Sequence, residues 1–218
     1  MKMSTGYLSE LSKVVVKEFD VPDFDEHSVL VKVKAAGICG SDLHAFHGSH
    51  PFRKAPMILG HEAAGEVVKV GAKVKQLKVG DRIAVEPIKA CGKCSYCLSG
   101  NYNLCPERVI AGVRGWLGTF AEYFVLPEQR AHKLPPELDY DLGVLAEPLA
   151  VGTHAVRLAN IKKGSTCVVL EPERSACSQE LPRRKPALAV FIAPISIASG
   201  YKSPKLWACT RSRQTRSR

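Results

Sequence analysis

Cys91-Gly92-Lys93-Cys94-Ser95-Tyr96-Cys97, closed by Cys105 after seven intervening residues, holds half of the chain's eight cysteines. Short Cys-x2-Cys loops let neighbouring sulfurs reach one centre, and the longer loop returns a fourth, so the thiols can surround a tetrahedral zinc ion. Two disulfides are the alternative, but the intracellular character of the rest of the sequence favours metal-bound thiolates. Because four thiolates leave no open position, we predict a structural zinc site.

The composition around this cluster is that of a globular protein. The chain has 218 residues, 45% of them hydrophobic, which allows one domain and part of a second. The N-terminus lacks the apolar segment of a signal peptide, and the longest apolar run, Ala187 to Ala198, is interrupted by Pro194. We expect a cytoplasmic protein with no membrane partner.

The positive charge is concentrated towards the C-terminus. The formal net charge is +10, and residues 171–218 hold ten Lys and Arg against three Glu. The first 170 residues are nearly balanced, with 21 basic and 18 acidic side chains. A basic arm can contact nucleic acid through phosphate charge, so a zinc module with such an arm is one alternative function.

Short strand patterns dominate the chain before the helix-like segment. Val-rich runs over residues 13–19 and 28–36 predict strands, and in the second run lysines alternate with valines as on a half-buried strand. Further strands are predicted over residues 63–71, 83–85 and 120–126, with a hairpin turn at 79–82. Short strands with glycine-rich turns favour a small β-barrel-like domain.

The pattern changes at Pro148. Apolar residues from Pro148 to Ile161 have helical spacing, Gly164 is suited to end a helix, and Thr166 to Leu170 predicts a short, fully buried strand. A helix followed by such a run is the beginning of a parallel α/β sheet.

Cys39 and His61 are candidate ligands of a second metal. Each lies at a predicted strand end in a loop with glycine, and Glu62 follows His61 directly. A catalytic zinc takes about three protein ligands and keeps one position open, a need that a thiol, an imidazole and a carboxylate meet. From spacing alone, Cys39 as a small buried hydrophobe and His61 as an ordinary loop residue remain alternatives.

Five motifs follow one another in a specific order within residues 12–170. They are Gly37 to His44, Gly60 to Gly65, Val79 to Arg82, the cysteines of residues 91–105, and Glu147 to Leu149. Together they resemble the zinc-containing medium-chain alcohol and polyol dehydrogenases, and Glu147 is similar to the sorbitol, threonine and butanediol dehydrogenase branch. The resemblance implies a mainly β, GroES-like catalytic domain over residues 1–147 with a zinc lobe at 88–108. It also implies a linking helix and the first strand of an incomplete α/β Rossmann domain over 148–170, followed by a basic, unrelated tail over 171–218.

The same resemblance implies roles for single residues. Cys39 and His61 would bind a catalytic zinc, Glu62 would bind it directly or in exchange with water, and Glu147 would bind the metal or hold its water. Ser41 and His44 match the family's proton relay. The alternatives are a helix-dipole role for Glu147, a helix cap for Ser41 and a plain surface role for His44.

The implied reaction oxidises a secondary alcohol to a ketone by hydride transfer to NAD(P), with zinc lowering the pKa of the alcohol. We expect two zinc ions per chain and a small alcohol or polyol substrate. Assembly as a homo-oligomer or with a sibling subunit stays open, as does a non-catalytic, regulatory role.

The resemblance stops after Leu170. The family has Gly-x-Gly-x-x-Gly there, since only glycine lets the backbone turn closely against the cofactor pyrophosphate. This chain reads Glu171-Pro172-Glu173-Arg174-Ser175-Ala176. Because carboxylates repel a pyrophosphate and Pro172 lacks a backbone N–H, we expect no such NAD(P) site, impaired dehydrogenase activity and a disordered or irregular tail.

The change at Leu170 has the form of a reading-frame shift. The codons GGA GCC GGA GCG encode Gly-Ala-Gly-Ala, and loss of one base gives GAG CCG GAG followed by CG. The new codons encode Glu-Pro-Glu and begin an arginine codon, which matches residues 171–174. We therefore interpret the chain as truncated after the first Rossmann strand, through a real frame change, splicing or a sequence error.

Overall fold

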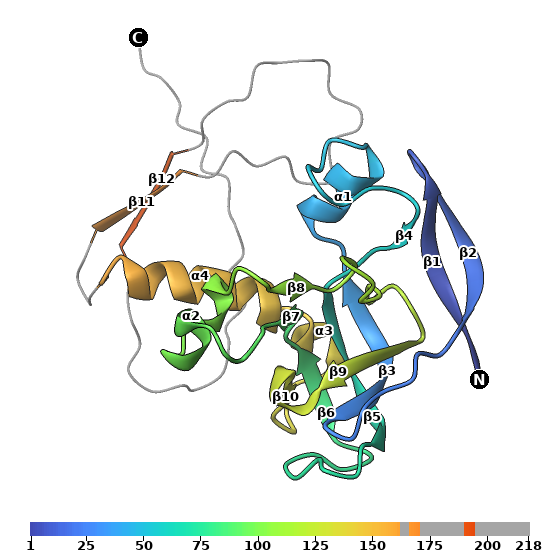
Figure 1. The fold of residues 1–218 in the computed structure, drawn as a ribbon. Helices are drawn as coiled ribbons and strands as arrows, with labels where there is room; N and C mark the ends of the chain where they lie inside the picture. The colour runs from blue at the N-terminus through green and yellow to red at the C-terminus, as the bar shows by residue number, and fades with distance from the viewer. Residues whose placement is uncertain (162–165, 171–189, 195–218) are drawn as a thin grey trace.

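Strands are the main regular secondary structure in the part of the chain that the computed structural model describes, which comprises residues 1–161, 166–170 and 190–194 (Figure 1). The larger sheet has five antiparallel strands in the order β10-β6-β5-β3-β9, and a smaller sheet has the order β2-β1-β4. Two further pairs are β7-β8 and β11-β12. The strands are β1 (Lys2–Glu10), β2 (Lys13–Asp20), β3 (Ser28–Gly37), β4 (Met57–Ile58), β5 (Glu62–Val70), β6 (Arg82–Val85), β7 (Ile88–Lys89), β8 (Val109–Ile110), β9 (Tyr123–Pro127), β10 (Ala131–Lys133), β11 (Thr166–Leu170) and β12 (Val190–Pro194).

Helical segments are short, apart from α4. They are α1 (Gly40–Phe46), α2 (Ser95–Leu98), α3 (Tyr140–Gly143), α4 (Ala146–Leu158) and the 3-10 turns η1 (Tyr102–Leu104) and η2 (Glu128–Arg130). None of the helices in the described ranges is long and apolar enough to cross a membrane.

β3 holds the larger sheet together, because it pairs with β5 on one side and β9 on the other. Its second half follows the predicted alternation, with Lys32 and Lys34 exposed and the valines between and before them more buried. In its first half, Val29, Leu30 and Val31 are all buried. Alternation fails there because both faces of the strand are covered.

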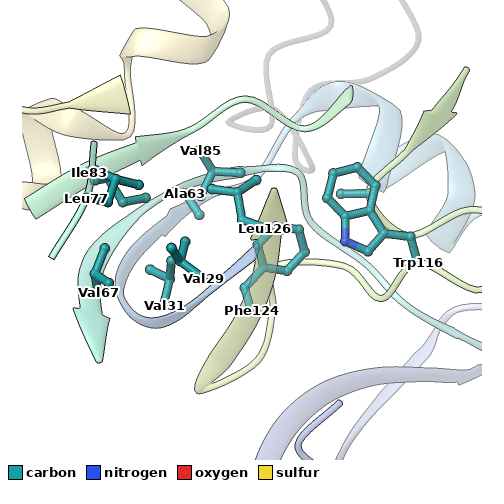
Figure 2. Close-up of a cluster of buried hydrophobic side chains, with 11 residues drawn as sticks. Val29, Val31, Ala63, Val67, Leu77, Ile83, Val85, Trp116, Phe124 and Leu126 are labelled. Carbon is teal, nitrogen blue, oxygen red and sulfur yellow. The ribbon is translucent and has the colours of Figure 1, made fainter. Parts of the chain in front are cut away.

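The main core lies between these strands and the loop that carries Trp116 (Figure 2). Trp116 stacks on Phe124 of β9, with ring centroids 5.3 Å apart and an interplanar angle of 28°. Its Nε1–H donates to the carbonyl of Val125 at 3.0 Å, so the indole fills the core without leaving its polar atom unpaired.

Residues 120–122 join the two larger sheets. The carbonyl of Phe120 accepts from Gly6 N–H in β1, and the carbonyl of Glu122 accepts from Val33 N–H in β3. This bridging segment explains why β9 begins at Tyr123 although the sequence predicts a strand from residue 120. These bonds connect the two sheets, which contribute to separate hydrophobic clusters, and the described part of the chain has the mainly β class that the sequence predicts.

Some expectations require correction. α4 ends at Leu158 and not near Gly164, because Asn160 adopts the left-handed region with φ 51°. The strand expected at 166–170 is present as β11, but its described partner β12 is antiparallel, whereas a parallel neighbour was expected. The burial of β11 side chains lies outside the described residues, as does most of the tail, in which β12 is a short strand.

The surface of α4 is unusually apolar. Leu149, Val151 and Leu158 are 67%, 64% and 74% exposed, and no residue of this helix is fully buried. A helix with apolar side chains on several faces is normally covered by other structure.

Replacement of Gly65 by Ala tests the close packing of the sheet. A Cβ at this position would lie 2.4 Å from the carbonyl oxygen of Lys32 on the neighbouring strand, so Gly65→Ala should lower the free energy of unfolding by about 2 kcal/mol or more. Gly152→Ala is the matched control, because a Cβ there meets no atom within 4 Å and lies in α4. Denaturant unfolding should show Gly152→Ala stabilised by up to about 1 kcal/mol; equal effects of the two changes would contradict this packing.

Two buried threonines, Thr5 and Thr119, allow a second matched test of stability. The hydroxyl of Thr119 has no hydrogen-bond partner within the described chain, whereas that of Thr5 donates to the carbonyl of Lys17 at 2.8 Å. Thr119→Val should therefore raise the free energy of unfolding by about 1 kcal/mol, and Thr5→Val should lower it by about the same amount. Thermal or denaturant unfolding of both variants measures the difference in sign, and a loss of stability in Thr119→Val would show that its hydroxyl has a partner.

Candidate metal centres

The four-cysteine lobe is built from one short stretch of chain. Cys94 directly precedes α2, and Cys105 directly follows η1, so two turns of helix place these thiols against the loop that carries Cys91. The β7-β8 pair closes the base of the lobe, with Ile88 opposite Ile110. The lobe lies on the side of the molecule away from the β1-β2 hairpin (Figure 1).

The sulfur positions fit a tetrahedral metal. The Sγ atoms of Cys91, Cys94, Cys97 and Cys105 all lie within 4.8 Å of one another. The Sγ atoms of Cys94 and Cys97 are 3.5 Å apart, and those of Cys91 and Cys97 are 3.8 Å apart. Metal–sulfur bonds of about 2.3 Å in a tetrahedron place sulfurs about 3.8 Å apart, whereas a disulfide requires about 2.05 Å. These four thiols are free, so the disulfide alternative is wrong for this stretch.

The thiols differ in acidity. Backbone N–H groups of Lys93 and Cys94 lower the pKa of Cys91 to about 7. Burial and a hydrogen bond with Cys94 raise the pKa of Cys97 to about 12. Four adjacent thiolates repel one another, and a divalent cation is the partner that lets all of them ionise. Zinc therefore fits this donor set, and the site it would occupy is closed.

A second cluster brings together Cys39, His61 and Glu62. Their ligand atoms also lie within 4.8 Å of one another. The antiparallel pairing of β3 with β5 explains why, because Gly37 at the end of β3 lies opposite Glu62 at the start of β5. Cys39 then follows at the N-terminus of α1. One thiol, one imidazole and one carboxylate form a three-ligand set that suits a catalytic zinc with an open position.

Two glycines make room for this cluster. A Cβ at Gly37 would lie 2.2 Å from Oε2 of Glu62, so the absent side chain leaves space for the carboxylate. Gly60 has φ +91°, and a Cβ there would contact the Phe120 ring at 2.5 Å. The turn that presents His61 therefore requires glycine for both conformational and steric reasons.

A buried ion pair lies behind the cluster. Asp42 and Arg53 are 2% and 4% exposed, and Nη1 of Arg53 donates to Oδ1 of Asp42 at 3.1 Å. Burial would raise the pKa of Asp42, but hydrogen bonds from His61 and from the N–H groups of Gly60 and Cys39 outweigh it and lower that pKa. Asp42 is the third residue of α1, and its carboxylate accepts the N–H of Cys39, the N-cap of that helix. Nothing in the spacing marks Arg53.

Glu147 lies at the first turn of α4, outside the three-ligand set. Burial raises the pKa of its carboxyl group, and the charge of Glu62 adds to this, while His61 and Arg53 act in the opposite direction. Glu147 is therefore close enough for the charges of His61 and Glu62 to act on it. Its role at the metal stays a prediction.

Ser41 and His44 lie on α1. The Ser41 hydroxyl is 3.5 Å from Nη1 of Arg53, and Ser41 is the second residue of the helix, so its cap position belongs to Cys39 instead. His44 is exposed, and its Nδ1 lies 3.0 Å from the Ser49 hydroxyl. Among the described residues, no hydrogen bond connects Ser41 with His44. The proton relay therefore stays a prediction.

Comparisons with known proteins identify relatives of this chain. The alcohol dehydrogenase GroES-like domain matches residues 25–136, which is half of the chain. A relative from Arthroderma otae, named "Probable D-xylulose reductase A", is 48% identical over 166 residues, covering 74% of this chain and 47% of the relative. The sorbitol dehydrogenase of Bacillus subtilis is 39% identical over 172 residues, covering 77% of this chain and 48% of that protein.

Solved structures show the same relationship. The crystal structure of 2R,3R-butanediol dehydrogenase from Bacillus subtilis superposes with a TM-score of 0.66 at 38% identity. The match covers 74% of this chain and 49% of that one. The chain thus spans about half the length of the curated relatives it matches. By its GroES-like domain and these relatives, the chain belongs to the zinc-containing medium-chain alcohol and polyol dehydrogenase family.

Proposed function

We propose that this chain provides the zinc-binding catalytic half of a dehydrogenase for small secondary alcohols or polyols. The observation that carries the proposal is the convergence of Cys39, His61 and Glu62 in a protein that also holds a separate, closed four-thiol site. One donor set is suited to chemistry and the other to structure. The alcohol-oxidising names of the relatives support the substrate class.

The domain arrangement is part of the proposal. Residues 1–147 form the catalytic domain with its zinc lobe at 88–108, residues 148–170 link it to the start of a Rossmann domain, and residues 171–218 form a basic tail. The GroES-like match at 25–136 lies inside the first of these units.

The residues of the Cys39 cluster have distinct tasks in this proposal. Zinc held there would supply Lewis acidity that lowers the pKa of the substrate alcohol. Cys39 and His61 hold the ion, and the Glu62 carboxylate completes the set or yields its place to water. Glu147, at the first turn of α4, would bind the metal or hold its water. Ser41 and His44 would carry the alcohol proton towards solvent.

This chain lacks the glycine motif that would bind the hydride acceptor, NAD(P). Relatives of this family transfer the hydride to NAD(P), but residues 171–176 place two carboxylates and Pro172 where the family has its glycines. We propose that this chain binds zinc and lacks tight NAD(P) binding, so that its own dehydrogenase activity is impaired.

Metal analysis of single variants tests the two-centre proposal. The full chain should bind two zinc ions, and Cys39→Ser and Cys94→Ser should each reduce this to one because each removes a ligand from a different cluster. His27→Asn, which lies outside both clusters, is the control and should keep two. Retention of both ions in Cys39→Ser would contradict a metal at the second centre.

A nucleotide titration tests the statement about the cofactor. Increasing NADH or NADPH should give no saturable change in nicotinamide fluorescence at micromolar concentrations, since the pyrophosphate lacks its glycine-rich cradle. The sorbitol dehydrogenase of Bacillus subtilis, treated identically, serves as the comparison. Saturable micromolar binding by this chain would overturn our interpretation of residues 171–176.

A further inference from the structure

Arg53 connects three separate segments behind the Cys39 cluster. Its Nη1 lies 3.1 Å from Oδ1 of Asp42 on α1 and 3.2 Å from Nδ1 of His61 before β5. Its Nη2 donates to the carbonyl of Ala111, in the chain that follows β8, at 3.2 Å. The guanidinium is almost completely buried, so each of these hydrogen bonds forms away from competing water.

The backbone of Arg53 is held as well. Its N–H donates to Nδ1 of His50 at 3.1 Å. Both ends of the residue are therefore fixed, and the hydrogen bonds offset the rotamer entropy that the side chain loses on ordering. The arginine serves as a rigid support for what it contacts.

Asp42 extends this support to both ligand-bearing loops. Oδ2 of Asp42 accepts the backbone N–H of Cys39 at 3.1 Å. Oδ1 accepts the backbone N–H of Gly60, the neighbour of His61, at 3.1 Å. One carboxylate thus sets the positions of Cys39 and His61 relative to each other, and Arg53 supplies the countercharge that this buried carboxylate requires.

Nδ1 of the His61 ring lies near two different partners, Arg53 and Asp42. Arg53 can only donate a hydrogen bond, whereas ionised Asp42, with Oδ2 3.5 Å from Nδ1, can only accept one. When Nδ1 is unprotonated it accepts from Arg53, and when Nδ1 carries the proton it faces Asp42. The second state leaves the Nε2 lone pair free for a metal, so the ring keeps its orientation in both tautomers.

We propose that Arg53 is a positioning residue of the Cys39 metal centre, acting through Asp42 and His61 to hold the ligands in place before a metal binds. The inference rests on the proposed function, because it assumes that this cluster binds metal. In this proposal Arg53 contributes more than stability. Burying a guanidinium is unfavourable, but here it holds the loops that carry Cys39 and His61 within ligand distance of each other.

A matched arginine separates positioning from general stability. Arg82 also joins distant segments, with Nη1 donating to the carbonyl of Pro136 at 3.2 Å and its guanidinium stacked on the Tyr140 ring. It contacts no member of either cysteine cluster within the described ranges. Arg82→Met should therefore lower stability without altering metal binding, while Arg53→Met should do both.

The experiment measures zinc affinity of the full chain by competition with a chelator, together with the absorption spectrum after cobalt substitution. In Arg53→Met, we expect affinity at the Cys39 centre to fall about 10- to 100-fold, with the corresponding cobalt bands shifted or weakened. The metal at the four-cysteine lobe should keep its affinity and spectrum. Arg53→Lys keeps the charge without the planar fork and should give a smaller loss.

The outcomes are distinct. If the folded Arg53→Met or Arg53→Lys chain binds both metals as tightly as the unchanged chain, with the same cobalt spectrum, the positioning role is wrong. If Arg82→Met weakens the Cys39 centre as much as Arg53→Met, the effect is one of stability, and the proposal also fails. If the unchanged chain binds only the four-cysteine metal, the proposed function itself fails, and the role of Arg53 fails with it. Should Arg53→Met not fold, Arg53→Lys carries the test.

Discussion

The antiparallel pairing of β3 with β5 is the constraint on which the candidate active centre depends. It places Gly37 opposite Glu62, and so brings the loop after β3 next to the turn before β5. Cys39 and His61 are 22 positions apart in the sequence and become neighbours only through this register. A shift of one residue would turn the side chains of a strand to its opposite faces and separate the ligands. The buried Asp42–Arg53 pair then fixes the two loops that the sheet has brought together.

The two clusters differ in how they arise, and this decides how well each can be predicted. The four cysteines lie within 15 consecutive residues, so local spacing alone indicates a tetrahedral site, and the free, converging thiols agree with it. The Cys39 cluster depends on long-range strand pairing. Residue spacing alone therefore does not predict it, and the prediction comes from the family resemblance. The positions of Glu62 and Glu147 illustrate the limit: one lies within the ligand set and the other beside it, a difference that only the packing of α4 determines.

The fold follows the same division. Strands with strong valine patterns, such as β2 and β3, and the helix α4 are predictable from sequence because their residues indicate structure locally. β1 is less evident, since its pattern is broken by Gly6 and it is stabilised by partners at residues 13–20 and 57–58. The end of α4 is not predicted, because Asn160 adopts a left-handed conformation. The partner of β11 is not predicted either, because the paired residues are 20 to 28 positions apart. Arg53 has no sequence signature, since its partners come from three segments.

We propose that a chain whose family resemblance ends at the first Rossmann strand still carries two chemically different zinc centres. Zinc-edge X-ray absorption of the full, metal-loaded chain tests it most directly, because sulfur and nitrogen or oxygen ligands lie at different distances. The account predicts both a sulfur shell near 2.3 Å and a nitrogen and oxygen shell at about 2.0–2.2 Å. A spectrum that contains sulfur ligands alone would contradict it, since only the four-cysteine lobe would then hold the metal.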